Sequence, residues 1–381
     1  MTEPAPIHQW VAKRPGAEVR TALERLRRAE GVAAIAVMPD VHLASEVCVG
    51  VALATESRLL PAAVGSDIGC GMAALAFEAG SDTDPSLDAV RERGPQLLAA
   101  IAKVVPIIRH RTRDRPELPD TLAERTLSSP ALERSKQREA PLQLGTLGRG
   151  NHFVELQVDE GGRPWLMVHT GSRGIGQGIR KWHEARASPG AGNLRSFEAE
   201  SEAGRAYLAD LGWALDYAAE NRARILRRVT EVLRGELGLE PLPETLVTCE
   251  HNFVRHEVHE GRSLWVHRKG AISAREGESG IIPGSMGSAS FIVSGRGEPR
   301  SLCSSSHGAG RAMARGEARR RIGIKQLRRE MSGVAFDERL VDRLRDEAPG
   351  AYKDIGAVMR AQRELTRVVH RLRPLMAFKG A

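Results

Sequence analysis

A carboxylate and a thiol stand three residues apart on a glycine-rich stretch, at Asp67 and Cys70. Glycines at 65, 69 and 71 allow the backbone to curve tightly around a small object. An oxygen donor beside a sulfur donor suits a borderline divalent metal ion. By itself the hexapeptide from Asp67 to Met72 favours a simpler interpretation, a strand-terminating turn with a buried cysteine. The histidines that follow reverse that preference.

Three histidines are expected at strand ends, at positions 152, 169 and 251. A single histidine so placed is more often a core residue than a metal ligand. Three of them, together with Asp67 and Cys70, exceed what one tetrahedral ion requires. The surplus predicts two ions that share the thiolate, an arrangement suited to phosphoryl transfer. Mixed oxygen, nitrogen and sulfur donors leave manganese and zinc both open.

His307 lies in a run of serine and glycine that is expected to open a basic helix. Free N–H groups at a helix N-terminus favour phosphate, and a histidine placed there could accept a phosphoryl or nucleotidyl group. Arg311 and Arg315 follow one and two turns later, on one expected helix face, where they could hold phosphate oxygens. The alternative is an ordinary capped helix with a solvated basic face.

A second loop of small residues runs from Pro283 through Gly284, Ser285 and Met286 towards Ser290. Small side chains would let a base or a ribose approach the backbone closely. Lys379, near the C-terminus, follows the apolar stretch 375–378. It is therefore expected either on a terminal strand or as a frayed terminal charge.

Alternating apolar residues predict strands that pair as hairpins, 153–158 with 165–169 and 252–258 with 263–269. Residues 198–237 predict a long helical tract of one or two helices, and residues 354–371 predict a final helix. Residues 109–140 are poor in apolar side chains and predict an exposed excursion. Strands that come as hairpins favour an α+β fold, here a single compact domain with mixed sheets flanked by helices.

The chain has 381 residues, a hydrophobic fraction of 41% and a formal net charge of +8. This balance makes a polyanionic partner plausible without proving one. The four cysteines show no CxxC spacing, so a disulfide framework is not expected. No signal peptide or apolar run of membrane-spanning length is visible. We therefore expect a cytoplasmic protein with no membrane partner.

The motifs together resemble the RtcB family of RNA-splicing ligases. The matching strings occur in the family's order over nearly the whole chain, and no single string would decide the match. They are Met38 to His42, Val64 to Met72, Leu144 to Glu155, His169 to Gly174, His267 to Ala271, Ile281 to Gly287, His307 to Arg311 and Ala351 to Lys353.

The resemblance implies an enzyme that joins an RNA 3′-phosphate or 2′,3′-cyclic phosphate to a 5′-hydroxyl, with GTP and two Mn²⁺ ions. Cys70 would bridge the ions, with His152 and His169 on one and Asp67 and His251 on the other. His307 would form a histidine–GMP adduct, with Arg173, Arg311 and Arg315 on phosphate or RNA. The guanylate-binding positions would be Asn151, Glu155, Asn252, Pro283, Gly284, Ser285, Met286, Ser290, His307, Gly308, Ala309, Gly310, Tyr352 and Lys379. Within that set Glu155 and Lys379 would hold the guanine edge.

The chain departs from the family pattern beside the first string. The family commonly has Gly-Lys-Gly there, where this chain has Ala44, Ser45 and Glu46. The departure leaves open a divergent paralogue that guanylylates 3′ ends or hydrolyses cyclic phosphodiesters, or a non-catalytic RNA-binding paralogue. The RNA substrate, the oligomeric state and the need for an archease-like activating protein are left open too.

Overall fold

One side of the core is a five-stranded sheet in the computed structural model, which describes residues 4–44, 46–79, 90, 92–190 and 194–380. Its strand order is β1-β2-β3-β13-β12, with β1 parallel to β2 and the other neighbours antiparallel. Nearly every position of β2 and β3 is apolar, so these strands lie buried within the sheet. The strands are β1 Ile7–Gln9, β2 Val32–His42, β3 Val49–Thr55, β12 Asn252–His259 and β13 Arg262–Lys269.

A second, larger sheet has the order β10-β5-β7-β6-β18-β16-β15, and β11 pairs with β5 beside this path. All of its pairings are antiparallel. Both predicted hairpins are confirmed, as β6 with β7 here and as β12 with β13 in the first sheet. The strands are β5 Gly71–Ala79, β6 Phe153–Val158, β7 Pro164–Thr170, β10 Leu239–Pro241, β11 Val247–Glu250, β15 Ser279–Ile282, β16 Ser290–Gly295 and β18 Thr366–Lys379.

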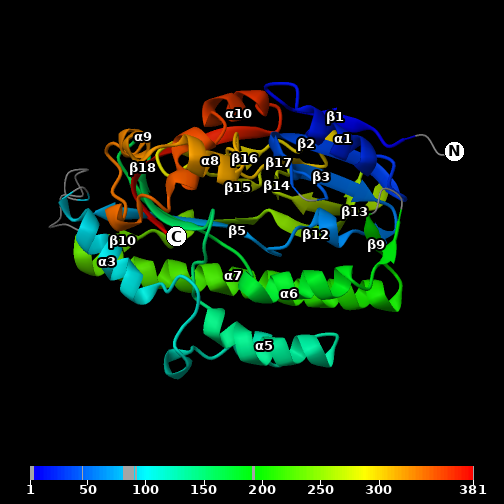
Figure 1. Ribbon diagram of the computed structural model, residues 1–381, viewed down its shortest axis with the longest axis horizontal. Coiled ribbons are helices and arrows are strands. Elements are labelled where there is room, and N and C mark those ends of the chain that lie inside the picture. Colours follow the sequence, from blue (N-terminus) through cyan, green and yellow to red (C-terminus); the bar gives the residue numbers. More distant parts are fainter. Residues whose placement is uncertain (1–3, 45, 80–89, 91, 191–193, 381) are drawn as a thin grey trace.

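Both faces of the larger sheet are covered, because its strands are apolar on both sides. On β5, Leu75 and Phe77 point to a cluster that includes α3 (Gly94–Val104) and α7 (Glu202–Leu237). The alternate residues Met72 and Ala74 point to a second cluster formed with β15 and β16. Figure 1 shows α7 lying along one side of the sheets. The fold is therefore the expected α+β arrangement in one compact domain.

The long helical tract is one helix, α7, rather than two. Ser201 caps its first turn by accepting a hydrogen bond from the Gly204 N–H, and Gly238 ends it in a left-handed conformation with φ of 62°. Next to it lie α6 (Arg173–Glu184) and, outermost, α5 (Pro130–Gln143) (Figure 1). Most of segment 109–140 is exposed, but Leu122 and Leu132 are buried in the cluster that α6 and α7 share. The second half of that segment therefore rests on the helices instead of projecting freely.

The remaining elements are short. β14 Ala271–Ser273 and β17 Ser304–Ser306 form a two-stranded sheet, and β4 Arg58–Leu59, β9 Arg195–Glu198 and β8 Ser188–Pro189 form a three-stranded sheet. The other helices are α1 Ala17–Leu26, α4 Asp120–Ala123, α8 Arg315–Arg321, α9 Ile324–Glu330 and α10 Ile355–Ala361. Single 3₁₀ turns are Pro61–Ala63, Thr112–Asp114, Pro243–Thr245, Pro299–Ser301, Glu338–Leu340, Arg345–Glu347 and Pro349–Ala351. Within the described part of the chain, no helix combines the length and the apolar character that crossing a bilayer requires.

The prediction of a final helix over 354–371 is wrong beyond Ala361. The chain turns there and enters β18, which pairs with β16 on one side and β6 on the other. Val368 and Val369 are β-branched and suit a strand, and pairing with β16 over 366–372 and then with β6 over 373–379 satisfies backbone groups along it. This pairing also places Lys379 on a strand, opposite Phe153.

Candidate active site

Strand register brings the predicted metal ligands to one end of the larger sheet. Cys70 directly precedes β5, His169 lies in β7, and their strands pair Met72 with His169. His152 directly precedes β6, the other neighbour of β7. His251 follows β11, and its N–H donates to the carbonyl oxygen of Cys70 at 2.9 Å. Four segments far apart in sequence thus meet because the strands between them are paired.

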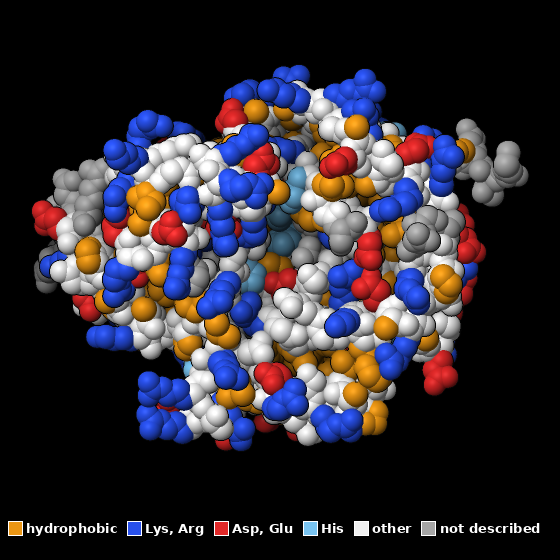
Figure 2. Space-filling view, viewed as in Figure 1, with side chains coloured by type: hydrophobic (Ala, Val, Ile, Leu, Met, Phe, Trp, Pro, Cys, Tyr) orange, Lys and Arg blue, Asp and Glu red, His pale blue; other side chains and the backbone are white. Residues whose placement is uncertain are grey.

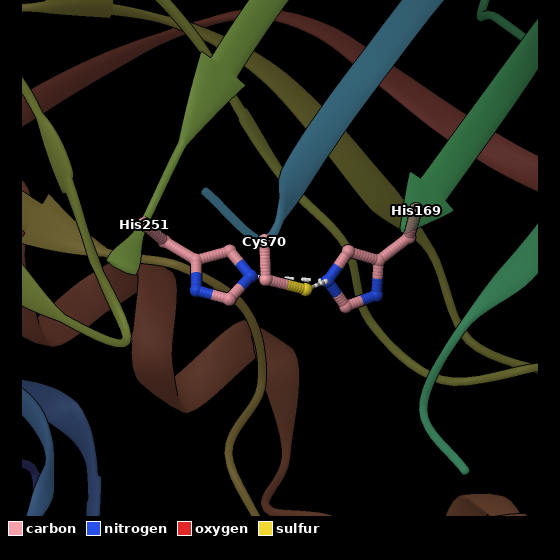
Figure 3. Close-up of side chains that lie close together, drawn as sticks. All are labelled: Cys70, His169 and His251. Atoms are coloured by element: carbon pink, nitrogen blue, oxygen red, sulfur yellow. Dashed lines mark hydrogen bonds between the residues drawn. The ribbon is translucent and has the colours of Figure 1, made fainter. Parts of the chain in front are cut away.

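The donor atoms of these residues form two groups that share Cys70. Its Sγ lies 3.3 Å from His169 Nε2, which lies 3.0 Å from His251 Nε2. The same Sγ lies 3.4 Å from His152 Nε2, which lies 3.0 Å from Asp67 Oδ2. Figure 3 shows Cys70 between the facing rings of His169 and His251. Within each group the donor atoms all lie within 4.8 Å of one another.

The donor atoms group differently from the ligand partition that the family resemblance implies, although both arrangements share the Cys70 thiol. His152 groups with Asp67, and His169 groups with His251. The cause is the turn before β5, which directs Asp67 away from His251 and towards His152. A Cβ at Gly171 would lie 2.5 Å from the Asp67 carboxylate, so only glycine admits that side chain here.

Each ligand histidine is held through its other ring nitrogen, as metal ligands usually are. The Nδ1 partners are the carbonyl oxygen of Leu147 for His152, the carbonyl oxygen of Asn151 for His169 and Oδ1 of Asn252 for His251. Burial holds the pKa of His169 and of His251 well below the usual value, so both rings are neutral. Burial and the nearby Asp67 raise the pKa of the Cys70 thiol. A metal ion must therefore displace a proton from Cys70, but none from His169 or His251.

This donor set fits two divalent ions. One carboxylate, one thiol that both groups share and three imidazoles have the mixed hardness that borderline metals accept. The donors are also pre-oriented, because each ring is fixed by a hydrogen bond on the side away from the centre.

His307 lies beside this centre but not at a helix N-terminus, so that prediction is wrong. It follows β17, and residues up to Ala314 are non-helical before α8 begins at Arg315. The segment takes this path because Gly310, with φ of 70°, packs on the backbone of Asp40, where a Cβ would lie 2.3 Å from the carbonyl oxygen. Arg311 and Arg315 therefore do not share a helix face.

The His307 ring is oriented by the buried carboxylate of Asp40. Its Nδ1–H donates to Asp40 Oδ2 at 2.6 Å, and its backbone N–H donates to the same oxygen at 3.1 Å. Nε2 is then left with a lone pair. The ring lies 4.6 Å from that of His251, measured between centroids. Asp40 was missed as a site residue, although a carboxylate inside the apolar strand β2 is a visible signal.

A cavity of about 390 Å³ opens over the metal ligands and His307. Figure 2 shows histidine side chains within a hollow of this face, with Lys and Arg side chains around it. The predicted residues that line it are Asp67, Cys70, Asn151, Glu155, His169, His251, Asn252, Pro283, Gly284, Ser285, Met286, His307, Gly308, Ala309, Gly310, Arg311, Arg315, Tyr352 and Lys379. His42, Arg180 and Lys269 line it as well and were not predicted.

Three predicted residues stand behind the cavity wall. Ser290 is buried, and its Oγ accepts hydrogen bonds from Gln157 Nε2 and the Gly284 N–H. Arg173 packs behind the metal ligands, with Nη1 3.3 Å from His152 Nδ1. His152 is itself a ligand but does not border the open space. Ser290 and Arg173 thus support the site without facing it.

Another part of the cavity wall, which we call the nucleotide end, is lined by charged residues. Glu155 is buried there, and burial raises its pKa to about 8. Lys379 Nζ lies 2.6 Å from Oε2 of Glu347, a buried carboxylate that was also missed. Glu347 lies in a charged stretch before Pro349, where nothing in the sequence separates it from a solvated acid. Tyr352 and Arg311 complete this end, with the guanidinium carbon 5.0 Å from the ring centroid.

A histidine aligned by a carboxylate thus lies beside two groups of donor atoms that could hold metal ions, at a cavity large enough for a small ligand. The model of the family described as tRNA-splicing ligase RtcB matches residues 22–128 and 114–380. The RNA-splicing ligase RtcB of Escherichia coli K12 is 36% identical over 411 residues, covering 100% of this chain and 98% of that protein.

More distant relatives agree. The RNA-splicing ligase RtcB of Mycobacterium tuberculosis is 29% identical over 420 residues, covering 90% of this chain and 96% of its own length. The tRNA-splicing ligase RtcB of Thermococcus kodakarensis is 31% identical over 426 residues, covering 90% and 87%. The chain belongs to the RtcB family.

Proposed function

We propose that this protein is an RNA ligase that joins 3′-phosphate or 2′,3′-cyclic phosphate ends to 5′-hydroxyl ends, with GTP and Mn²⁺. Family membership supports RNA ligation, and the site supports the finer steps. The observation that carries the proposal is His307, whose Nδ1 is held by Asp40 while its ring packs on the metal ligand His251. A histidine that only bound RNA would need neither feature.

His307 is the proposed nucleophile towards GTP. With the Nδ1 proton donated to Asp40, the Nε2 lone pair attacks the α-phosphorus. The bond from that phosphorus to the bridging oxygen breaks, and pyrophosphate leaves. Asp40 holds the tautomer and stabilises the positive charge that the ring gains, as the carboxylate of a catalytic triad does.

Asp67, Cys70, His152, His169 and His251 would hold two Mn²⁺ ions. When bound, the ions supply positive charge that offsets the charge on the reacting phosphates. The chain contributes the shared thiolate and three imidazoles in a buried, pre-oriented arrangement. The arginines at 311 and 315, which line the same cavity, would bind phosphate oxygens.

The nucleotide end of the cavity would hold the guanine base. Glu155 and Lys379 offer an acceptor and a donor, which match the N–H groups and the carbonyl oxygen on the guanine edge. The small residues of 283–286 and 308–310 leave room for the ribose.

RNA joining follows from the same adduct. GMP passes from His307 to the RNA 3′-phosphate, so the P–N bond breaks as a pyrophosphate linkage forms. The RNA 5′-hydroxyl then attacks the former 3′-phosphate, a phosphodiester forms and GMP leaves. A bare 3′-phosphate is a poor electrophile, and GMP provides the leaving group that it lacks.

Incubation with α-labelled GTP and Mn²⁺, followed by denaturing electrophoresis, tests the proposal. We expect an acid-labile label on the wild-type protein and none on His307→Ala, which should still bind metal and GTP. His256→Ala, at an exposed position of β12, is the matched control and should label normally. An unlabelled wild type would contradict the proposal, and a labelled His307→Ala would assign the nucleophile elsewhere.

A second assay supplies the protein, after incubation with GTP and Mn²⁺, with RNA that has 5′-hydroxyl ends and either 3′-phosphate or 2′,3′-cyclic phosphate ends. Ligated product is the expected result. Accumulation of capped 3′ ends without joining would instead indicate a 3′-guanylylating paralogue, and cyclic phosphate opening without labelling would indicate a phosphodiesterase.

A further inference from the structure

Glu347 is a buried carboxylate whose two oxygens serve different partners. Its Oε2 accepts hydrogen bonds from Lys379 Nζ at 2.6 Å and from the Tyr352 hydroxyl at 2.7 Å. Lys379 and Tyr352 both line the end of the cavity that carries Glu155. One oxygen of Glu347 therefore holds the residues assigned to the base.

The other oxygen holds the arginines. Arg315 Nη1 donates to Glu347 Oε1 at 2.5 Å, and Arg311 Nη1 donates to the same atom at 3.4 Å. Both arginines line the cavity, on the segment that follows His307. One side chain therefore joins the base end of the site to the phosphate end.

The charges explain why this carboxylate stays ionised. Burial alone would raise the pKa of Glu347, but Lys379 and Arg315 more than compensate and hold it below its usual value. Without the carboxylate, buried Lys379 would lose its ion-pair partner while two guanidinium groups stay close. Glu347 is thus the carboxylate that three cations around one cavity share.

We propose that Glu347 is a positioning residue that couples the selection of guanine by Lys379 to the binding of phosphate by Arg311 and Arg315. This inference rests on the proposed function, because it assumes that the cavity binds a guanine nucleotide. Glu347 does not itself touch the reacting atoms. It places the donors on both sides, so a disturbance at one end of the nucleotide site reaches the other end.

The neighbouring Asp346 is a matched control. It is buried to the same degree, with 2% of its surface exposed against 3% for Glu347. Its Oδ2 accepts a hydrogen bond from Arg315 at 2.9 Å, and Oδ1 lies 3.2 Å from Arg319 Nε. Within the described chain it contacts neither Lys379 nor Tyr352. Asp346 thus shares only the phosphate side of the network.

Equilibrium binding of GMP, AMP and guanosine, measured by calorimetry, tests the proposal without any reaction. The ratio of GMP to AMP affinity reports base selection. The ratio of GMP to guanosine affinity reports how much phosphate binding contributes. We expect Glu347→Gln to lower both ratios, each by about tenfold, because charged hydrogen bonds are lost on both sides. Asp346→Asn should lower only the ratio of GMP to guanosine. Glu347→Asp, which keeps the charge, should recover part of both.

A double-mutant cycle in the presence of intact Glu347 gives an independent measure. Lys379→Met and Arg315→Met should be non-additive for GMP affinity, because both residues share one carboxylate. In a chain that already carries Glu347→Gln, the effects of the two substitutions should be additive. If circular dichroism shows that this variant does not fold, the cycle in the otherwise native chain decides alone.

Two results would overturn the inference. One is additive behaviour of Lys379→Met and Arg315→Met in the otherwise native chain. The other is a folded Glu347→Gln that changes only one ratio, as Asp346→Asn does. A wild-type protein that binds no GMP, GTP or guanosine would instead overturn the proposed function, and the inference with it.

Discussion

The two ends of the cavity are built in different ways. At the metal end the side chains come from residues at the ends of paired strands, and backbone register sets their positions. Their rings are held mainly by carbonyl oxygens. At the nucleotide end Glu155 comes from β6, but the network of ion pairs joins a 3₁₀ turn, the segment that leads into α8 and the last residues of β18.

This difference predicts different responses to substitution. A donor placed by strand register has a fixed position and no substitute, so its loss should abolish a function. Charged side chains in one network of ion pairs can partly replace one another. The loss of one should therefore weaken a function instead of abolishing it. The following predictions test that contrast, from the largest effect to the smallest.

Cys70→Ala should remove metal binding almost completely, because both groups of donors share its sulfur. We expect at least about a 100-fold loss of Mn²⁺ affinity, beyond what changes outside the ligand shell produce. Metal content after dialysis, measured by mass spectrometry, checks this. Cys249→Ala is the control, since Cys249 is equally buried but belongs to the apolar cluster. Two ions retained by Cys70→Ala would refute the shared-ligand assignment.

Asp40→Asn should slow formation of the histidine–GMP adduct by about 100-fold, because the ring of His307 loses its fixed tautomer and the balancing charge. The rate of label incorporation at saturating GTP measures the effect. Metal content should match that of the wild type, since Asp40 contacts no metal ligand group. An unchanged rate would mean that Asp40 only packs against His307.

GTP affinity should rise with pH towards 8 because of Glu155. Burial raises the pKa of Glu155 to about 8, so the carboxyl is mostly protonated at pH 6.5 and half ionised at pH 8. Guanine presents two N–H donors on its edge and should prefer the ionised form. The affinity should therefore increase by about tenfold from pH 6.5 to 8. Glu155→Gln should flatten this pH profile, and a profile that keeps its slope in that variant would assign the titration to another group.

The smallest effect is expected at positions 44 to 46. Ser45 lies outside the described residues, but Ala44 lines the cavity and Glu46 Oε2 accepts a hydrogen bond from Arg180 at 3.0 Å. Arg180 is thus partly neutralised where RNA phosphate would approach. Restoring Gly-Lys-Gly should speed RNA joining by about threefold, without changing the rate of adduct formation, because exposed ion pairs are weak.

Glu46→Gln separates the two contributions at this loop. It frees Arg180 without adding a lysine, and Arg180 stays positioned by Glu184 at 2.7 Å. Joining rates that are equal for native, Glu46→Gln and restored proteins across a salt series would show that this loop does not touch the RNA.

The sequence by itself determined the residue types of the site and most of the strands around it. The five candidate metal ligands and His307 were singled out, because their chemistry and the glycines near them stand out in apolar surroundings. The hairpins of β6 with β7 and of β12 with β13 were predicted as well, because alternation and short turns are local signals.

Only the tertiary structure decided how those residues are grouped and oriented. His152 joins Asp67, and His169 joins His251, because strand register and the space left by Gly171 are not local properties. Asp40 and Glu347 belong to the site because of contacts between distant parts of the sequence. His307 lies 267 positions from Asp40, and Lys379 lies 32 positions from Glu347. The stretch after His307 and the residues beyond Ala361 have helix-like composition but are not helical. There, packing of Gly310 on Asp40 and pairing of β18 with β16 and β6 outweigh local propensity, because each buried backbone group must find a partner.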